Sequence, residues 1–219
     1  MNNNIAIDGP AGAGKSTVAK AVAKKLGLIY VDTGAMYRAL GLYLIRNSIN
    51  VNDEAAVIST LDKADVTIDY ENGEQVVLLN SENVNGLIRT QEVSEMASAC
   101  SAISDVRKSM VKRQQALAKE KDVVMDGRDI CEVVLPDART KIFLTASADV
   151  RAKRRYDELT AKGVECDFEE IKADIIKRDD RDMNRAASPL RKTDDATLVD
   201  TSDMSVDEVI DRIVGLANG

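Results

Sequence analysis

The fold of this chain is decided by a stretch near its start, Gly9-Pro10-Ala11-Gly12-Ala13-Gly14-Lys15-Ser16-Thr17. It has the Gly-x-x-x-x-Gly-Lys-Ser spacing of a phosphate-binding loop, and it stands between a short apolar run and a segment with helical periodicity. Glycines let the backbone wrap closely around a ligand, and the wrapped amides donate to phosphate oxygens at the positive end of the following helix. Lys15 can reach the β- and γ-phosphates, and the Ser16 hydroxyl can ligate Mg²⁺. The stretch therefore predicts binding of a nucleoside triphosphate, because an ordinary glycine-rich turn would not need all of these positions.

Composition narrows the class of protein. The chain has 219 residues, enough for one α/β domain with a small insertion. Hydrophobic residues make up 44%, aromatic residues only 3%, and Trp is absent, so aliphatic side chains must fill the core. The net charge of −7 argues against a polyanion such as DNA as the main partner. Because the chain contains no His, a His general base and His metal ligands are excluded.

Cysteine usage and the absence of apolar runs predict the compartment. Cys100, Cys131 and Cys166 are widely spaced and odd in number, which favours reduced thiols in a cytosolic protein over a disulfide framework or a zinc site. The N-terminus lacks the basic and apolar regions of a signal peptide, and no apolar run is long enough to span a membrane. We therefore expect a cytoplasmic protein.

Strands alternate with helices along the chain, which predicts a three-layer α/β fold around a parallel, doubly wound sheet. The five strands are expected at residues 4–8, 28–31, 122–126, 141–144 and 197–200. The helices are expected after the loop as far as residue 26, at 33–47, 53–63, 91–102, 105–120, 149–162 and 167–182, and from 205 onward. Ligands of such sheets bind beyond the carboxyl ends of the strands.

Several helix ends have sequence signals of their own. Gly27 occupies the position of a left-handed C-cap, and Thr33 occupies an N-cap position. Asp167 begins a segment that resembles a capping box, and Ser205 with Glu208 three residues later predicts another.

The middle of the chain departs from this alternation. Two runs of strand length, residues 66–70, which alternate between apolar and polar side chains, and residues 75–79, are separated by Glu-Asn-Gly-Glu at 71–74. Asn-Gly between two such runs is a strong hairpin signal. We expect a small antiparallel insertion at about residues 64–90.

Two polar motifs follow predicted strands. In the first, Asp32-Thr33-Gly34-Ala35-Met36-Tyr37-Arg38, the Thr33 hydroxyl and Arg38 can hold a second phosphate, although an ordinary N-cap with a solvated Arg is an alternative. In the second, Asp126-Gly127-Arg128-Asp129, the carboxylate of Asp126 can position Mg²⁺ through water and Arg128 can clamp a phosphate. Asp129 can accept hydrogen bonds from an exocyclic amine. A tight turn with a surface ion pair is the alternative here.

Arginines are concentrated on two predicted helices. Arg151, Arg154 and Arg155 lie on one, with Arg151 and Arg155 a turn apart on a shared face. The other carries a face formed by Arg178, Asp182 and Arg185, with Arg181 beside it. Arginines stabilise the charge that spreads over a phosphoryl group in transfer, whereas charge runs on helices are more often solvated surface. The phosphate-binding loop favours the functional interpretation.

In this order the motifs resemble those of bacterial cytidylate (CMP/dCMP) kinases, within the nucleoside monophosphate kinase family of P-loop kinases. The resemblance covers nearly the whole chain and is carried by the phosphate loop, 32–38, Arg89-Thr90-Gln91-Glu92-Val93, 126–129 and Arg178-Asp179-Asp180-Arg181-Asp182-Met183-Asn184-Arg185. It implies transfer of the γ-phosphoryl group of ATP to CMP or dCMP with Mg²⁺, in the cytosol, usually by a monomer without nucleic-acid or membrane partners. It also implies a single P-loop kinase domain over 1–219, with a monophosphate-binding part at 33–110 and a lid with arginine-rich helices at 149–185.

The resemblance assigns roles to residues. ATP would contact the loop from Gly9 to Thr17 with the lid arginines Arg154 and Arg155, and Ser16 would ligate Mg²⁺ with the ATP phosphates. The CMP phosphate would contact Thr33, Arg38, Arg128 and Arg185, the sugar would contact Arg178 and Asp182, and the base would contact Ser98, Arg107 and Asp129. Tyr37 completes the CMP set. The residues expected to act on the transferred group are Lys15, Arg128, Arg154, Arg181 and Arg185. The cytosine amine suits Asp129, whereas the uracil carbonyl would face it unpaired.

Two other interpretations stay open. In the first, the chain is another P-loop kinase, with UMP, AMP or shikimate as acceptor. The Phe-Pro-Arg segment of adenylate kinases is absent, which argues against AMP. In the second, the chain is a nucleotide-dependent switch ATPase that has no phosphate acceptor. The Asn-Lys-x-Asp motif with which GTPases read the base does not occur in the chain.

Overall fold

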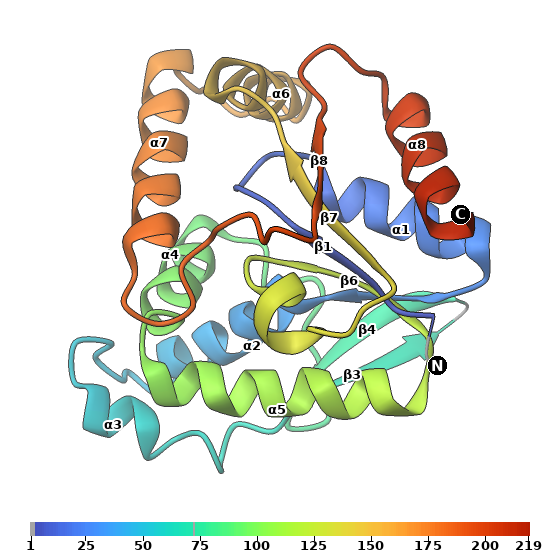
Figure 1. Cartoon of the computed structure of the whole chain (residues 1–219). Helices are drawn as coiled ribbons and strands as arrows, with labels where there is room; N and C mark the ends of the chain where they lie inside the picture. Colours follow the sequence, from blue (N-terminus) through green and yellow to red (C-terminus); the bar gives the residue numbers. More distant parts are fainter. Residues whose placement is uncertain (1–2, 72) are drawn as a thin grey trace. The chain divides into compact units, whose positions relative to one another are not determined.

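The structure, a computed structural model, describes residues 3–71 and 73–219. It divides into two compact units. The first unit is Met1–Tyr30 together with Lys121–Gly219, and the second is Val31–Glu120. Figure 1 labels the α-helices and many of the strands of both. Within the described residues no helix has the length and apolarity needed to cross a membrane.

Five strands form the main sheet, in the order β2-β6-β1-β7-β8. They are β1 (Ile5–Asp8), β2 (Ile29–Asp32), β6 (Val123–Gly127), β7 (Thr140–Thr145) and β8 (Thr197–Asp200). β1 is fully buried and pairs in parallel with β6 and β7. Asp8 lies opposite Gly127, so the phosphate loop after β1 and Arg128 after β6 leave the sheet at the same edge. The predicted five-stranded parallel sheet is confirmed.

Helices surround this sheet in the first unit. They are α1 (Lys15–Leu26), the π-helix η1 (Ile130–Val134), α6 (Ala148–Ala161), α7 (Phe168–Asn184) and α8 (Val206–Asn218). α1 packs against α8 and β6, and the buried residues of this core are all aliphatic, such as Ile7, Val22 and Ile213. The sequence carried no prediction for η1.

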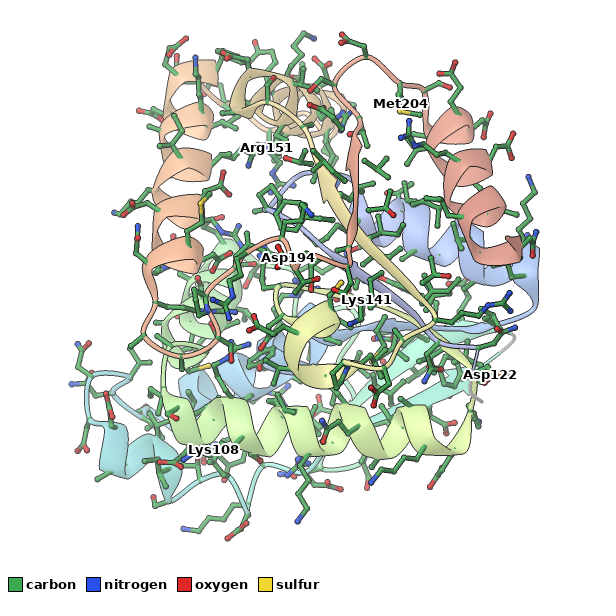
Figure 2. All side chains as sticks on the ribbon, viewed as in Figure 1. Lys108, Asp122, Lys141, Arg151, Asp194 and Met204 are labelled. Atoms are coloured by element: carbon green, nitrogen blue, oxygen red, sulfur yellow. The ribbon has the colours of Figure 1, made fainter. Side chains whose placement is uncertain are left out.

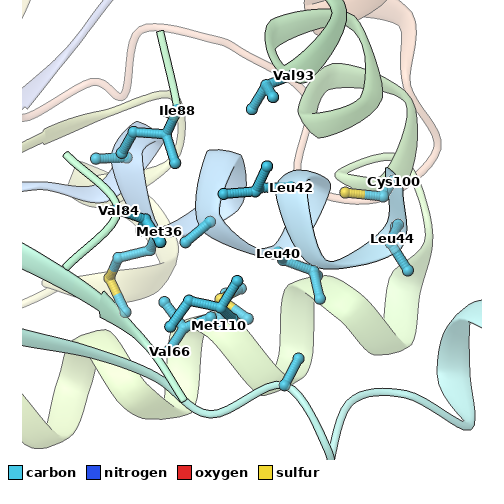
Figure 3. Packing of buried hydrophobic residues seen from close by; sticks show 14 of the residues in the cluster. Met36, Leu40, Leu42, Leu44, Val66, Val84, Ile88, Val93, Cys100 and Met110 are labelled. Atoms are coloured by element: carbon cyan, nitrogen blue, oxygen red, sulfur yellow. The ribbon is translucent and has the colours of Figure 1, made fainter. Parts of the chain in front are cut away.

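The second unit has its own core. Its elements are α2 (Thr33–Arg46), α3 (Glu54–Ile58), β3 (Val66–Glu71), β4 (Glu74–Leu79), β5 (Glu82–Asn83), α4 (Gln91–Cys100) and α5 (Ser104–Glu120). Figure 3 shows part of the cluster that they bury, including Met36, Leu40 and Met110. α2 and α4 approach closely at Gly41, where a Cβ atom would lie 3.0 Å from the backbone nitrogen of Ala97. Glycine is therefore needed there for packing.

The antiparallel insertion predicted at 64–90 is present. β3 pairs antiparallel with β4, with Val66 opposite Leu79. Asn72 of the predicted turn lies outside the described residues. A third strand, β5, pairs with β4 and was not predicted, because two polar residues give no strand pattern. Asn80 and Ser81 join β4 to β5 with φ angles of 50° and 68°, as in a two-residue hairpin turn with left-handed central residues.

Two predictions about helix ends were wrong. Asp32, not Thr33, caps α2, because its carboxylate accepts a hydrogen bond of 2.9 Å from the backbone nitrogen of Ala35. Thr33 is the first helical residue. The helix expected at 53–63 ends at Ile58, and residues up to 63 continue it only as tighter turns, such as the bond from the Lys63 nitrogen to the Thr60 carbonyl.

Other helix ends match their signals. Gly27 caps α1 in the left-handed conformation, with φ 69°. Ser205 and Glu208 form a reciprocal capping box at α8. The carboxylate of Asp167 accepts from the backbone nitrogen of Glu170 at the start of α7. Local sequence therefore determines most of these boundaries.

Candidate active site

The phosphate loop lies between β1 and α1 in the first unit. A Cβ atom at Gly9 would lie 1.9 Å from the carbonyl oxygen of Leu144, so only glycine allows the loop to start this close to β7. Gly14 precedes the first turn of α1 with φ 89°, a left-handed conformation that disfavours other residues. The backbone therefore adopts the geometry that the sequence motif requires.

Lys15 lies in the first turn of α1 and is buried. Its Nζ donates a hydrogen bond of 2.8 Å to the carbonyl oxygen of Pro10. Burial, followed by repulsion from Arg128, lowers its pKa to about 7, although the carboxylates of Asp126, Asp8 and Asp182 oppose this. A cation held against another cation in a dry site favours the binding of an anion.

Ser16 and the end of β6 form an oxygen-rich group. The Ser16 Oγ donates to Asp126 Oδ2 at 3.0 Å, and the Tyr30 hydroxyl donates to Asp126 Oδ1 at 2.9 Å. Tyr30 was not among the predicted site residues, because residues 28–31 predicted only a buried strand. A hydroxyl beside a carboxylate next to the phosphate loop suits Mg²⁺, which prefers oxygen ligands and binds through few protein groups.

Asp8, the last residue of β1, was likewise not among the predicted site residues. The residue is 1% exposed, and its carboxylate accepts hydrogen bonds from the backbone nitrogens of Ile130, at 2.9 Å, and Cys131, at 2.7 Å. Burial raises its pKa, although these two bonds oppose the change. The carboxylate thus holds the start of η1, directly after Arg128 and Asp129.

Arg128 connects the end of β6 to α7. Its Nε donates to Asp182 Oδ2 at 2.7 Å. Burial alone would raise the pKa of Asp182, but Arg128, with help from Arg185 and Arg178, lowers it. Asp129 is buried beside Arg128, and the Arg185 Nε donates to the carbonyl oxygen of Ser188 at 2.7 Å. The first unit therefore gathers these predicted acceptor residues on neighbouring segments.

The predicted lid arginines differ in their surroundings. Arg154 donates to the hydroxyl and carbonyl oxygens of Thr201, at 3.1 and 2.8 Å, and its guanidinium lies 3.9 Å from where a Cβ atom on Gly14 would stand. Arg155 is exposed and pairs with Glu158 at 2.9 Å. Arg181 is exposed on α7. Arg154 therefore lies next to the phosphate loop, at Gly14.

The second unit contains the other predicted acceptor residues. Arg38 forms an ion pair of 3.0 Å with Asp32. The guanidinium carbon of Arg107 lies 5.7 Å from the ring centre of Tyr37, and its Nη1 donates to the carbonyl oxygen of Ser101 at 3.2 Å. Thr33 is buried, and Ser98 on α4 is half-buried. Arg107 is held rigidly, because it is only 4% exposed and both stacks and donates.

The fold and this group of residues define a class of protein. A phosphate loop after the central strand of a parallel sheet, with a buried Lys, a Ser–Asp oxygen pair and arginines at the same edge, is the arrangement of a P-loop kinase.

Comparison with known proteins identifies the family. The cytidylate kinase family model matches residues 5–219. A cytidylate kinase of Caldicellulosiruptor saccharolyticus is 50% identical over 213 residues, which cover 97% of this chain and 94% of that protein. A cytidylate kinase of Geobacillus sp. is 48% identical over 220 residues, which cover 100% and 98%. The chain therefore belongs to the cytidylate kinase family of ATP-dependent phosphotransferases.

The similarity of this chain to one solved structure concerns the fold alone. An uncharacterized protein from Eubacterium ventriosum superimposes with a TM-score of 0.51 at 16% identity, covering 98% of both chains.

Proposed function

We propose that this chain transfers the γ-phosphoryl group of ATP to CMP or dCMP, giving ADP and CDP or dCDP. The observation that carries the proposal is the pair of basic side chains at one edge of the sheet, the buried Lys15 and the half-buried Arg128, in a chain of the cytidylate kinase family. These cations repel each other in the free protein, and the phosphates of two bound nucleotides would relieve that repulsion.

The transfer requires no general base. A phosphate oxygen of CMP, already anionic near neutral pH, attacks the γ-phosphorus of ATP, and the bond to the β–γ bridging oxygen breaks to release ADP. The protein aligns two polyanions and neutralises their repulsion. In the proposal Lys15, Arg128, Arg154, Arg181 and Arg185 supply the positive charge. The absence of His from the chain agrees with chemistry of this kind.

Mg²⁺ is the proposed cofactor. Ser16 would ligate it together with ATP phosphates, and Asp126, which accepts the Ser16 hydroxyl at 3.0 Å, would hold it directly or through water. When bound, the ion neutralises charge on the β- and γ-phosphates. Tyr30 keeps Asp126 oriented through its second oxygen.

The acceptor contacts are proposed residue by residue. Thr33, Arg38, Arg128 and Arg185 would hold the CMP phosphate, Arg178 and Asp182 the sugar, and Ser98, Arg107 and Asp129 the base, with Tyr37 behind Arg107. Residues 33–110 would act as the monophosphate-binding part and 149–185 as the lid. Arg155, now paired with Glu158, would have to exchange partners to contact ATP.

We also propose that the chain acts in the cytoplasm as a monomer, without nucleic-acid or membrane partners. The free cysteines Cys100, Cys131 and Cys166 support the compartment, and the net charge of −7 argues against a nucleic-acid partner. The monomer is what the resemblance to the family implies.

A coupled assay of ADP release tests the function. ATP and Mg²⁺ are supplied with CMP, dCMP, UMP, AMP or shikimate in turn. We expect turnover with CMP and dCMP, and much less with the others. Turnover on UMP or AMP with little on CMP would overturn the acceptor assignment, and hydrolysis of ATP indifferent to every acceptor would indicate a switch ATPase.

A further inference from the structure

Arg151, in the first turn of α6, is buried and fully hydrogen-bonded, which the run of charged residues on this helix did not predict. It is 5% exposed and is labelled in Figure 2. Its Nε donates to the carbonyl oxygen of Ala146 at 2.9 Å, and its Nη1 donates to the carbonyl oxygen of Ala11, in the phosphate loop, at 3.0 Å. Its Nη2 lies 2.7 Å from Asp179 Oδ2 on α7. Every nitrogen of the guanidinium is therefore engaged within the first unit.

The contact with Ala11 fixes the direction of one peptide group. No cis peptide bond occurs among the described residues, so the Ala11 carbonyl and the Gly12 N–H point in opposite directions. With the carbonyl held by Arg151, the Gly12 N–H faces away from α6. The stem of Arg151 also lies against this peptide, because a Cβ atom at Gly12 would lie 3.3 Å from the Arg151 Cβ.

Asp179 holds Arg151 in this position. It is 7% exposed, and its carboxylate oxygen Oδ2 is the one that faces Arg151. A buried pair of this kind is strongly directional, since removing either partner leaves an uncompensated charge. Asp179 is adjacent in sequence to Arg178 and lies one turn before Asp182, so Arg151 ties the phosphate loop to the helix that carries these proposed acceptor residues.

We propose that Arg151, oriented by Asp179, is a positioning residue that fixes the Ala11–Gly12 peptide so that the Gly12 N–H is ready to donate to an ATP phosphate. The inference rests on the proposed function only in taking ATP as the ligand of the loop. It concerns binding of the donor and does not depend on the acceptor.

The test compares Arg151→Met, which keeps the apolar stem but removes the donors, with Asp179→Asn and Arg151→Lys. Two matched controls are available. Lys153→Met removes an exposed ion pair with Asp157 from the same helix. Arg113→Met removes another arginine that donates to main-chain carbonyls, in the second unit. Calorimetry measures the Kd of ATP with Mg²⁺ in the absence of acceptor, and thermal unfolding is followed for each variant.

We expect Arg151→Met to raise the Kd of ATP about tenfold, the equivalent of one hydrogen bond to a charged group, while the KM of CMP at saturating ATP stays within about twofold. Asp179→Asn should raise the Kd less, because the bond to Ala11 can persist. Arg151→Lys, with one nitrogen in place of three, should lie between the wild-type protein and Arg151→Met. Arg113→Met should lower the unfolding temperature and leave the Kd unchanged.

An unchanged Kd in Arg151→Met, or in Arg151→Lys if the Met variant does not fold, would overturn the proposal. So would an equal rise in Arg113→Met or Lys153→Met, because general loosening or loss of surface charge would then explain the effect. If CMP proves not to be the acceptor while the Kd of ATP still responds to Arg151, the proposed function fails and this inference stands.

Discussion

The hydrogen bonds from the backbone nitrogens of Ile130 and Cys131 to Asp8 lead to a quantitative prediction for Asp8→Asn. The asparagine keeps one acceptor oxygen but places an amide nitrogen against one of these backbone donors. One hydrogen bond to a charged group is then lost, about 1.5–3 kcal/mol, and one buried donor is left unpaired, about 1–3 kcal/mol. Part of this is offset, because burial of the carboxylate is itself unfavourable, as its raised pKa indicates.

We therefore expect Asp8→Asn to destabilise the protein by about 2 kcal/mol, which lowers the unfolding temperature by about 4–8 °C for a chain of this length. Because Arg128 and Asp129 directly precede the bonded residues, kcat/KM for CMP should fall at least about tenfold, equivalent to about 1.4 kcal/mol. Differential scanning calorimetry and the coupled ADP assay measure the two effects.

The sign of the pH dependence provides a further check. The pKa of Asp8 is higher in the folded state than its ordinary value of 3.8, so its ionisation opposes folding, and its contribution to stability decreases as the pH rises from about 4 through the folded pKa. Asp8→Asn lacks this dependence, and the difference in stability should be largest at low pH. Asp53→Asn, which alters a helix cap where Asn is equally favourable, is the control. Equal unfolding temperatures and equal kinetics for wild type and Asp8→Asn would refute the reasoning.

Three other predictions concern the loop and the acceptor site. Lys15 has a pKa of about 7 in the free protein, below its usual 10.5, so the stability of the protein should rise as the pH increases from about 7 to 10.5. For the same reason ATP binding near pH 8.5 should take up about one proton, which calorimetry in buffers of different ionisation enthalpy measures. Binding without proton uptake would contradict the argument that burial lowers the pKa of Lys15. Asp129→Ala should raise the KM of CMP at least about tenfold while the Kd of ATP changes little, and an unchanged CMP dependence would remove Asp129 from the site. Gly9→Ala should abolish ATP binding or folding, because its Cβ would stand 1.9 Å from the Leu144 carbonyl oxygen; a folded variant with normal affinity would show that β7 can move.

Features of the fold that depend on neighbouring residues were predictable. The phosphate loop, the capping box of Ser205 and Glu208, and the hairpin of β3 and β4 each arise from a few consecutive residues whose conformational preferences agree. The parallel sheet followed from the alternation of strands and helices. The errors were also local: the cap of α2 was placed one residue late at Thr33, because Asp32 was read as the end of a strand.

The order of residues along the chain already specifies a triphosphate-binding loop at the start of a parallel α/β sheet, and it shows which charged residues are available around that loop. Tertiary structure alone decided how these charges are used. Arg151 and Arg155 lie one turn apart and look equivalent in sequence, yet Arg151 is buried against Ala11, 140 residues away, while Arg155 is exposed and pairs with Glu158. Asp8 likewise reaches Cys131 across 123 residues. The physical reason is that the free energy of a charged side chain depends on its solvation and its partners, which the folded chain sets and its neighbours in sequence do not.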